Sequence, residues 1–269
     1  MYINKETQNM LNEFSQLQEV EGILLAGSYA TKTNDKNSDY DIYIYVTNEI
    51  AIEKRKTITG KYCSYMELNN NFWETEDDGV LKESGVPIEI IYRNLDAWDK
   101  VLSRILIKYE ADTGYTTCFW ANVLNSVIIY DKNGSLNKLQ EKYSVPYPRK
   151  LKENIISKNY PLLKLQMPAY YHQIEKALKR DDYVSVNHRV AALFASYFDI
   201  IFAINEMPHP GEKKLLKIIK DNNLKIPLNM NENVNNILRL SSLNNTDILV
   251  EIDKLIYNLD MLLKKEDLW

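Results

Sequence analysis

The chain has 269 residues, of which 45% are hydrophobic and 26% are charged, and its formal net charge is -4. This is the composition of an ordinary globular protein, and the length suits one large domain or two ordinary ones. No apolar run approaches the roughly 18 residues of a membrane span, and the first residues lack a basic-then-apolar signal pattern. Cys63 and Cys118 stand in no metal-binding or redox spacing, so we interpret them as reduced thiols. We therefore expect a cytoplasmic protein with no membrane partner.

The first half of the sequence alternates between helix and strand patterns. Apolar residues recur at helical spacing from Met10 to Leu17, which predicts an amphipathic helix, and residues 95–110 are also expected to be helical. The polar, glycine-punctuated stretch NNNFWETEDDGVLKESG (69–85) is expected to be a loop, or a loop with a short turn of helix. Strands are expected over five apolar or alternating segments, GILLAG (22–27), DIYIYV (41–46), KYCSYMEL (61–68), PIEIIY (87–92) and SVIIYD (126–131).

Strand patterns stop after VPYPRK (145–150), and helical patterns follow to the end. The apolar segment NHRVAALFASYFDIIFAIN (187–205) predicts the central helix of a bundle. Breaks are expected at four places, namely Pro168, PHPG (208–211), NNLKIPLNMNEN (222–233) and SSLNN (241–245). We therefore predict an α+β protein, with a mixed β-sheet flanked by helices over residues 1–147 and an all-α helical bundle over residues 148–269.

Two aspartates stand one residue apart where the strand DIYIYV begins. Alternation along a strand places Asp39 and Asp41 on one face, where each raises the pKa of the other unless a cation lies between them. Mg²⁺ is a hard ion that takes one or two carboxylates plus substrate phosphates. Glu89 is an acid inside the otherwise apolar PIEIIY, and it completes a metal-binding triad if that strand lies beside 41–46.

A small Gly-Ser pair precedes these acids, at the end of GILLAG. Gly27 lets the backbone approach a ligand closely, and Ser28 with the following N–H groups can hold phosphate oxygens. Each piece also has a plainer interpretation. The Gly-Ser pair can be a simple turn, SDYD can be a turn or helix cap, and Glu89 can be an edge-strand residue that faces water.

The order strand, Gly-Ser, loop, Asp-x-Asp, strand and later acid resembles the nucleotidyltransferase superfamily related to DNA polymerase beta. The stretch LLAGSYATKTNDKNSDYDIYIYV, followed by PIEIIY, carries the resemblance. It implies that Asp39, Asp41 and Glu89 bind Mg²⁺, two ions in all, and that Gly27 and Ser28 hold the nucleoside triphosphate. The two-domain layout is similar to the kanamycin and lincosamide nucleotidyltransferases, which implies a catalytic domain over 1–147 and an acceptor-binding domain over 148–269.

Position alone suggests further candidates in the second half. The segment PHPGEKKLL is expected to place His209 and Glu212 at the start of a helix, where anions and acceptors are easily bound. Lys213 and Lys214 are candidates to meet the triphosphate, and Glu212 and Asp199 are candidate general bases. The plainer alternative is a proline and an early glutamate that stabilise a helix N-terminus, and a buried Asp199 satisfied by a neighbouring helix.

We expect an enzyme that transfers a nucleoside monophosphate, AMP in the first instance, from an NTP such as ATP to a hydroxyl of a small molecule. Pyrophosphate is released, and an aminoglycoside- or lincosamide-type antibiotic is one acceptor. Residues 148–225 carry an excess of basic residues. That excess keeps open an alternative in which a tRNA end or a protein side chain is modified, although nucleic acid is the less favoured partner. The third alternative is a nucleotide-sensing module without catalysis. The sequence does not indicate the oligomeric state.

Overall fold

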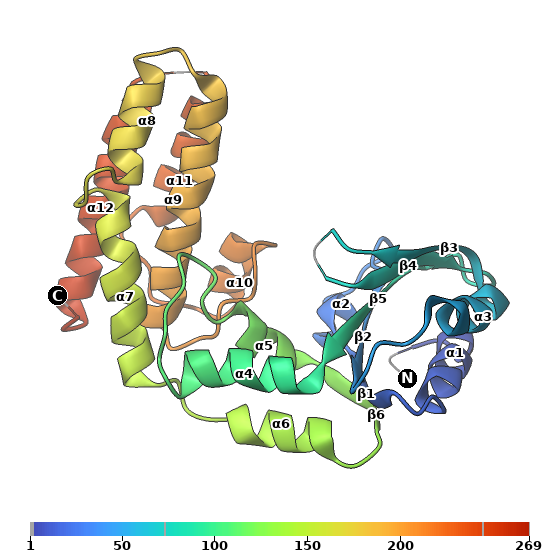
Figure 1. The fold of residues 1–269 in the computed structure, drawn as a ribbon. Coiled ribbons are helices and arrows are strands. Elements are labelled where there is room, and N and C mark those ends of the chain that lie inside the picture. The colour runs from blue at the N-terminus through green and yellow to red at the C-terminus, as the bar shows by residue number, and fades with distance from the viewer. Residues whose placement is uncertain (1–2, 73, 244, 269) are drawn as a thin grey trace. The chain divides into compact units, whose positions relative to one another are not determined.

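The computed structural model describes residues 3–72, 74–243 and 245–268 (Figure 1). The chain forms two compact units. The first comprises Met1–Ser103 and Asn122–Val145, and the second comprises Arg104–Ala121 and Pro146–Trp269. The segment Arg104–Ala121, which the sequence-based division at residue 147 assigns to the first domain, thus packs with the second unit. Trp73 of the predicted loop and Asn244 of the predicted SSLNN break lie outside the described residues.

A six-stranded mixed sheet forms the frame of the first unit, with the strand order β3-β4-β5-β2-β1-β6. β2 and β5 run parallel, while the other neighbouring strands pair antiparallel. This confirms the predicted α+β architecture with a mixed sheet. The strands are β1 Val20–Leu25, β2 Tyr40–Val46, β3 Cys63–Asn70, β4 Glu76–Leu81, β5 Pro87–Asn94 and β6 Val127–Asp131.

The strand β4 corrects the prediction of a loop over residues 69–85. Its sequence, EDDGVL, contains three acids and a glycine, residue types that isolated propensity disfavours in strands. It is nevertheless hydrogen-bonded on both sides, to β3 and to β5. Pairing on both edges therefore overrides the local preference, and the strand lies inside the sheet.

Helices cover one face of this sheet with a continuous apolar core. Met10 and Phe14 of α1 and Ile58 of α3 pack with Ile42 and Ile90 of the central strands. This confirms the amphipathic helix predicted near the N-terminus. The helices that lie wholly in the first unit are α1 Lys5–Ser15, α2 Gly27–Ala30, α3 Ile52–Tyr62 and α6 Ser135–Tyr143, whereas α4 Leu95–Leu106 and α5 Cys118–Asn125 cross the division between the units.

The second unit is helical, as predicted, and its core is built around α9. This helix is buried along most of its length, which agrees with the apolar segment 187–205. None of the helices in the described part of the chain combines the length and hydrophobicity of a membrane span. The helices are α7 Arg149–Leu163, α8 Tyr170–Leu178, α9 Tyr183–Ile204, α10 Leu215–Asp221, α11 Met230–Ser241 and α12 Asp247–Lys265.

Candidate active site

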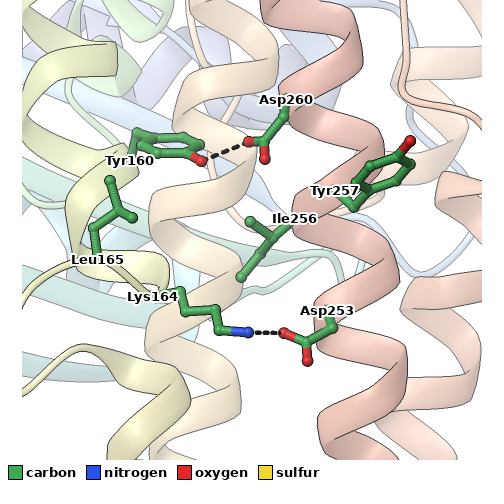
Figure 2. Close-up of a pocket in the computed structure, with 7 residues that line it drawn as sticks. All are labelled: Tyr160, Lys164, Leu165, Asp253, Ile256, Tyr257 and Asp260. Atoms are coloured by element: carbon green, nitrogen blue, oxygen red, sulfur yellow. Dashed lines mark hydrogen bonds and ion pairs between the residues drawn. The ribbon is translucent and has the colours of Figure 1, made fainter.

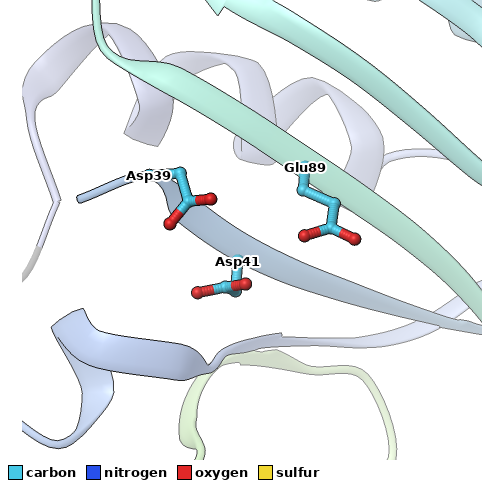
Figure 3. Close-up of side chains that lie close together, drawn as sticks. All are labelled: Asp39, Asp41 and Glu89. Atoms are coloured by element: carbon cyan, nitrogen blue, oxygen red, sulfur yellow. The ribbon is translucent and has the colours of Figure 1, made fainter. Parts of the chain in front are cut away.

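Three carboxylates gather at the N-terminal end of β2. Asp39 immediately precedes the strand, and Asp41 lies in direct register with Glu89 on the parallel strand β5. One carboxylate oxygen from each residue lies within 4.8 Å of the others (Figure 3). The expectation that β5 lies beside β2 is thereby confirmed. A metal-binding role for the three residues stays a prediction that this geometry suits.

The electrostatics of the cluster are unfavourable for the carboxylates alone. Burial, together with the nearby negative charges of Glu76, Asp78 and Asp39, raises the pKa of Glu89 to about 7. A divalent cation would remove this repulsion, because it is a hard ion that prefers carboxylate oxygens. The donor set therefore fits a divalent cation.

The turn after β1 is shaped around Asp41. The Ala26 amide donates to the Asp41 carbonyl oxygen (2.8 Å), and Gly27 follows with a φ of 58°. A Cβ at Gly27 would lie 1.7 Å from the Asp41 Oδ2 atom, so only glycine leaves this carboxylate its place. Ser28 Oγ is buried with no hydrogen-bond partner among the described residues. Since buried hydroxyls normally have partners, this one fits a role in holding a ligand oxygen.

Two further acids, which the sequence analysis missed, approach Glu89 from β4. Asp78 lies in register with Glu89, and Glu76, Asp78 and Glu89 each offer an oxygen within 4.8 Å of the others. They were missed because the stretch was interpreted as a loop. The spacing of Glu74, Glu76 and Asp78 by two residues is the strand signal that could have revealed them.

Arg93 of β5 is a buried cation on the same face of the sheet. Its guanidinium lies over the rings of Tyr43 and Trp98, 3.7 Å and 4.0 Å from the ring centroids. It also donates to both carboxylate oxygens of Glu74, at 3.0 Å and 2.6 Å. Arg93 is therefore paired with Glu74 and with aromatic rings.

Asp199, a candidate base, lies in the interior of the second unit. Its side chain accepts hydrogen bonds from the Thr116 amide (3.1 Å), the Thr116 hydroxyl (2.6 Å) and Asn159 Nδ2 (3.3 Å). Burial raises its pKa to about 7. These contacts fit the plainer alternative, in which Asp199 anchors the segment around Thr116 to α7 and α9.

The expectation that PHPGEKKLL places His209 and Glu212 at the start of a helix is wrong. The helix α10 begins at Leu215 and has only seven residues, with Lys214 in the left-handed conformation before it. His209 and Glu212 therefore precede the helix instead of starting it. His209 is buried between the rings of Tyr115 and Phe202, and burial lowers its pKa to about 4.

Glu212 lines a mainly apolar cavity of about 510 Å³ within the second unit. Tyr115, Phe194 and Phe198 supply its aromatic wall, and the side chains of Lys214 and Lys217 also reach it. Lys213, the other candidate for the triphosphate, lies on the exposed turn before α10. The volume falls in the range of about 300–1,000 Å³ typical of small-molecule sites.

A second cavity of the helical unit, about 310 Å³, lies between α7 and α12 (Figure 2). Four of its polar groups form two pairs: Tyr160 donates to Asp260 (2.5 Å), and Lys164 forms an ion pair with Asp253. Because the cation of this cavity is already paired with a carboxylate, we assign it no ligand.

Comparison with known proteins agrees with the geometry of the first unit. Residues 8–86 match the family model "Polymerase beta, Nucleotidyltransferase", a match that includes Gly27, Ser28, Asp39 and Asp41 and ends before Glu89. Residues 117–215 match a "Domain of unknown function (DUF4037)". A search of curated proteins gave no significant match. Residues 8–86 of the first unit are therefore similar to nucleotidyltransferases of the superfamily related to DNA polymerase beta, as the sequence resemblance predicts.

Eleven solved chains match the structure, among them a nucleotidyltransferase-like protein from Exiguobacterium sibiricum. The two chains are 12% identical, the match covers 97% of this chain and 74% of the other, and the TM-score is 0.44. A likeness at this level carries no inference about activity.

Proposed function

We propose that the protein is a divalent-cation-dependent nucleotidyltransferase that moves a nucleoside monophosphate, AMP in the first instance, from an NTP to a hydroxyl of a small molecule. The observation that carries the proposal is the convergence of Asp39, Asp41 and Glu89 beside Gly27 and Ser28. The acceptor oxygen forms a bond to the α-phosphorus, the bond to the β-phosphate oxygen breaks, and pyrophosphate leaves.

Each residue of the first unit has a distinct part in this proposal. Asp39, Asp41 and Glu89 would hold Mg²⁺, which supplies charge neutralisation to the triphosphate and to the attacking oxygen. Gly27 leaves the Asp41 carboxylate its place, and the buried Ser28 hydroxyl would donate to a phosphate oxygen. Positioning and charge neutralisation are most of what phosphoryl-type transfer requires, so these five residues would supply most of the donor half.

The acceptor half of the proposal rests on the second unit. The apolar cavity lined by Tyr115 and Glu212 has the size for a small molecule. Glu212 is exposed at this cavity, so its carboxylate is accessible to a bound hydroxyl and is the candidate to take its proton. An aminoglycoside- or lincosamide-type antibiotic is the acceptor class that the resemblance suggests. Lys213 remains a candidate contact of the triphosphate.

A macromolecular acceptor is the second candidate, favoured by the basic excess over residues 148–225. Incubation with α-labelled NTP and either total RNA or cell protein separates the two. Label in a small-molecule fraction alone supports the first candidate, and label in RNA or protein supports the second. Mg²⁺-dependent NTP binding without pyrophosphate release from any acceptor would instead indicate a nucleotide sensor.

The experiment that tests the catalytic proposal is substitution of the paired aspartates. Asp39→Asn and Asp41→Asn should each leave the fold intact by circular dichroism and reduce pyrophosphate release at least 100-fold, because a cation ligand is lost. Asp35→Asn is the matched control, since Asp35 lies in the same exposed segment and loses the same charge. Full activity in both variants would overturn the proposal.

A further inference from the structure

The hydroxyl of Tyr43 ends a chain of hydrogen bonds on the same face of the sheet as Asp41 and Glu89. Tyr43 lies two residues after Asp41 on β2, so the two side chains project from that face together. The tyrosine is 7% exposed, and its ring packs against the Arg93 guanidinium. A hydroxyl buried this deeply is expected to have partners for both its oxygen and its proton.

Arg93 fixes the direction of this chain of hydrogen bonds. A guanidinium carries N–H donors only, and Arg93 Nη1 donates to Asn122 Oδ1 (3.2 Å) while its other two nitrogens donate to Glu74. The opposite orientation of the Asn122 amide would place its NH₂ group against the guanidinium, donor against donor. Asn122 Nδ2 therefore faces Tyr43 and donates to the hydroxyl oxygen (2.9 Å).

The proton of the Tyr43 hydroxyl has no acceptor within the described chain. Over residues 3–72, 74–243 and 245–268 the hydroxyl forms one hydrogen bond, in which its oxygen accepts from Asn122. Burial, together with the charges of Asp41 and Glu89, raises the pKa of Tyr43 above its ordinary value of 10.0, so the hydroxyl keeps its proton at neutral pH. Tyr43 is thus a buried donor whose acceptor has to come from outside the chain.

We propose that the Tyr43 hydroxyl donates a hydrogen bond to an oxygen of the bound nucleoside triphosphate, and that Asn122 is the positioning residue that keeps this proton turned toward it. The inference rests on the proposed function, in which Asp41 and Glu89 hold the cation and its phosphates. Asp41 with Glu89, and Tyr43 with Ile91, are successive pairs on this face of β2 and β5, roughly 7 Å apart along the strands. The phenol therefore lies beside the place where the triphosphate would bind.

The test is calorimetric titration of a non-hydrolysable ATP analogue with Mg²⁺ into the natural chain and Tyr43→Phe. Loss of one hydrogen bond to a charged oxygen should weaken the affinity about tenfold. Tyr65→Phe is the matched control, because it removes an exposed hydroxyl on β3 and should bind like the natural chain. Circular dichroism confirms that each variant is folded.

The same titration with inorganic tripolyphosphate identifies the oxygen that Tyr43 contacts. Weaker binding of both the analogue and tripolyphosphate to Tyr43→Phe supports the proposal with a phosphate oxygen as the acceptor. Weaker binding of the analogue alone supports it with an oxygen of the nucleoside.

Asn122→Asp tests the direction of the hydrogen bond. The new carboxylate can still accept from Arg93, but it accepts the Tyr43 proton instead of donating to the hydroxyl oxygen. We expect Asn122→Asp to weaken analogue binding as much as Tyr43→Phe does, and to cause no further loss in the Tyr43→Phe background. Repulsion of the triphosphate by the added charge would instead weaken binding equally in both backgrounds, and this result would overturn the role of Asn122.

The outcomes also separate this inference from the proposed function. Equal affinity of the natural chain and Tyr43→Phe for the analogue overturns the inference alone, and would mean that water accepts the Tyr43 proton. Absence of Mg²⁺-dependent binding to the natural chain overturns the proposed function, and the inference with it.

Discussion

Buried acids on the two faces of the sheet have opposite electrostatic surroundings. On the face covered by α1 and α3, Asp77 is neutralised by Arg55 and receives two more hydrogen bonds. On the other face, Glu76 and Glu89 approach further carboxylates with no compensating cation of the described chain. Adjacent residues of one strand, Glu76 and Asp77, belong to these two environments.

This difference distinguishes buried charges that stabilise the fold from buried charges that are expected to bind a ligand. A buried ion pair that is fully hydrogen-bonded can be retained for the fold alone. A cluster of like charges is destabilising by itself and is expected where a ligand completes it. The comparison therefore predicts that substitutions on the Asp77 face weaken the fold, whereas substitutions on the Glu89 face weaken binding.

The largest expected effect on stability comes from Arg55→Met. It leaves the Asp77 carboxylate buried without its cation, which typically costs about 3–5 kcal/mol of unfolding free energy. Urea unfolding of the purified chain measures it. Lys54→Met is the control, because Lys54 is half-exposed and its ion pair with Glu19 is only partly buried, so the pair should contribute at most about 1 kcal/mol. Equal effects of the two variants would contradict the distinction between the faces.

Gly27→Ala should have the next largest effect. A side chain at a φ of 58° costs about 1–2 kcal/mol, and the new Cβ also displaces the Asp41 carboxylate. We expect lower stability together with loss of Mg²⁺-dependent NTP binding, measured by urea unfolding and by calorimetry. Gly60→Ala is matched to it, since Gly60 lies in α3 with open space at its Cβ position. That variant should gain roughly 0.5–1 kcal/mol.

The pH dependence of stability should report the uncompensated face directly. Glu89 has a folded pKa of about 7, above its ordinary value of 4.5, so the folded state binds the proton more tightly. Its stabilising contribution is complete below pH 4.5 and is lost as the pH rises to 7. In EDTA, Glu89→Gln should flatten this decline by about 1–2 kcal/mol. An unchanged slope of stability against pH in Glu89→Gln would contradict the assignment of this decline to Glu89. Asp199, with a pKa also raised to about 7, contributes a slope of the same sign that persists in the variant.

The smallest effect is expected for Glu76→Gln without metal. Removal of one charge from the cluster should leave stability unchanged or raise it by up to about 1 kcal/mol, because no cation loses its partner and the amide oxygen can still accept the hydrogen bond from Glu89. Thermal unfolding in EDTA measures this. A loss of more than about 2 kcal/mol would indicate that Glu76 is compensated like Asp77.

Sequence alone predicted the part of this site that rests on local patterns. The alternation of DIYIYV and the apolar PIEIIY identified β2 and β5, and with them the positions of Asp39, Asp41 and Glu89. It failed for β4, where acids and a glycine replace the usual strand residues and pairing with two neighbours determines the structure. Glu76 and Asp78 were missed for that reason.

Prediction from sequence has the same limit in the second unit. Its helical character followed from apolar periodicity, and the central helix α9 agrees with the prediction. The start of α10 did not follow, because Lys214 takes a left-handed conformation that no residue type in GEKKLL indicates. The burial of Asp199 against Thr116 likewise depends on a contact between residues 83 positions apart in the chain.

The most direct test of the central claim is calorimetric titration of a non-hydrolysable ATP analogue, with and without Mg²⁺, into the natural chain and Asp41→Asn. We expect binding to the natural chain that requires Mg²⁺ and is at least tenfold weaker in Asp41→Asn, with both proteins folded. Equal Mg²⁺-dependent affinity in the two proteins would contradict it.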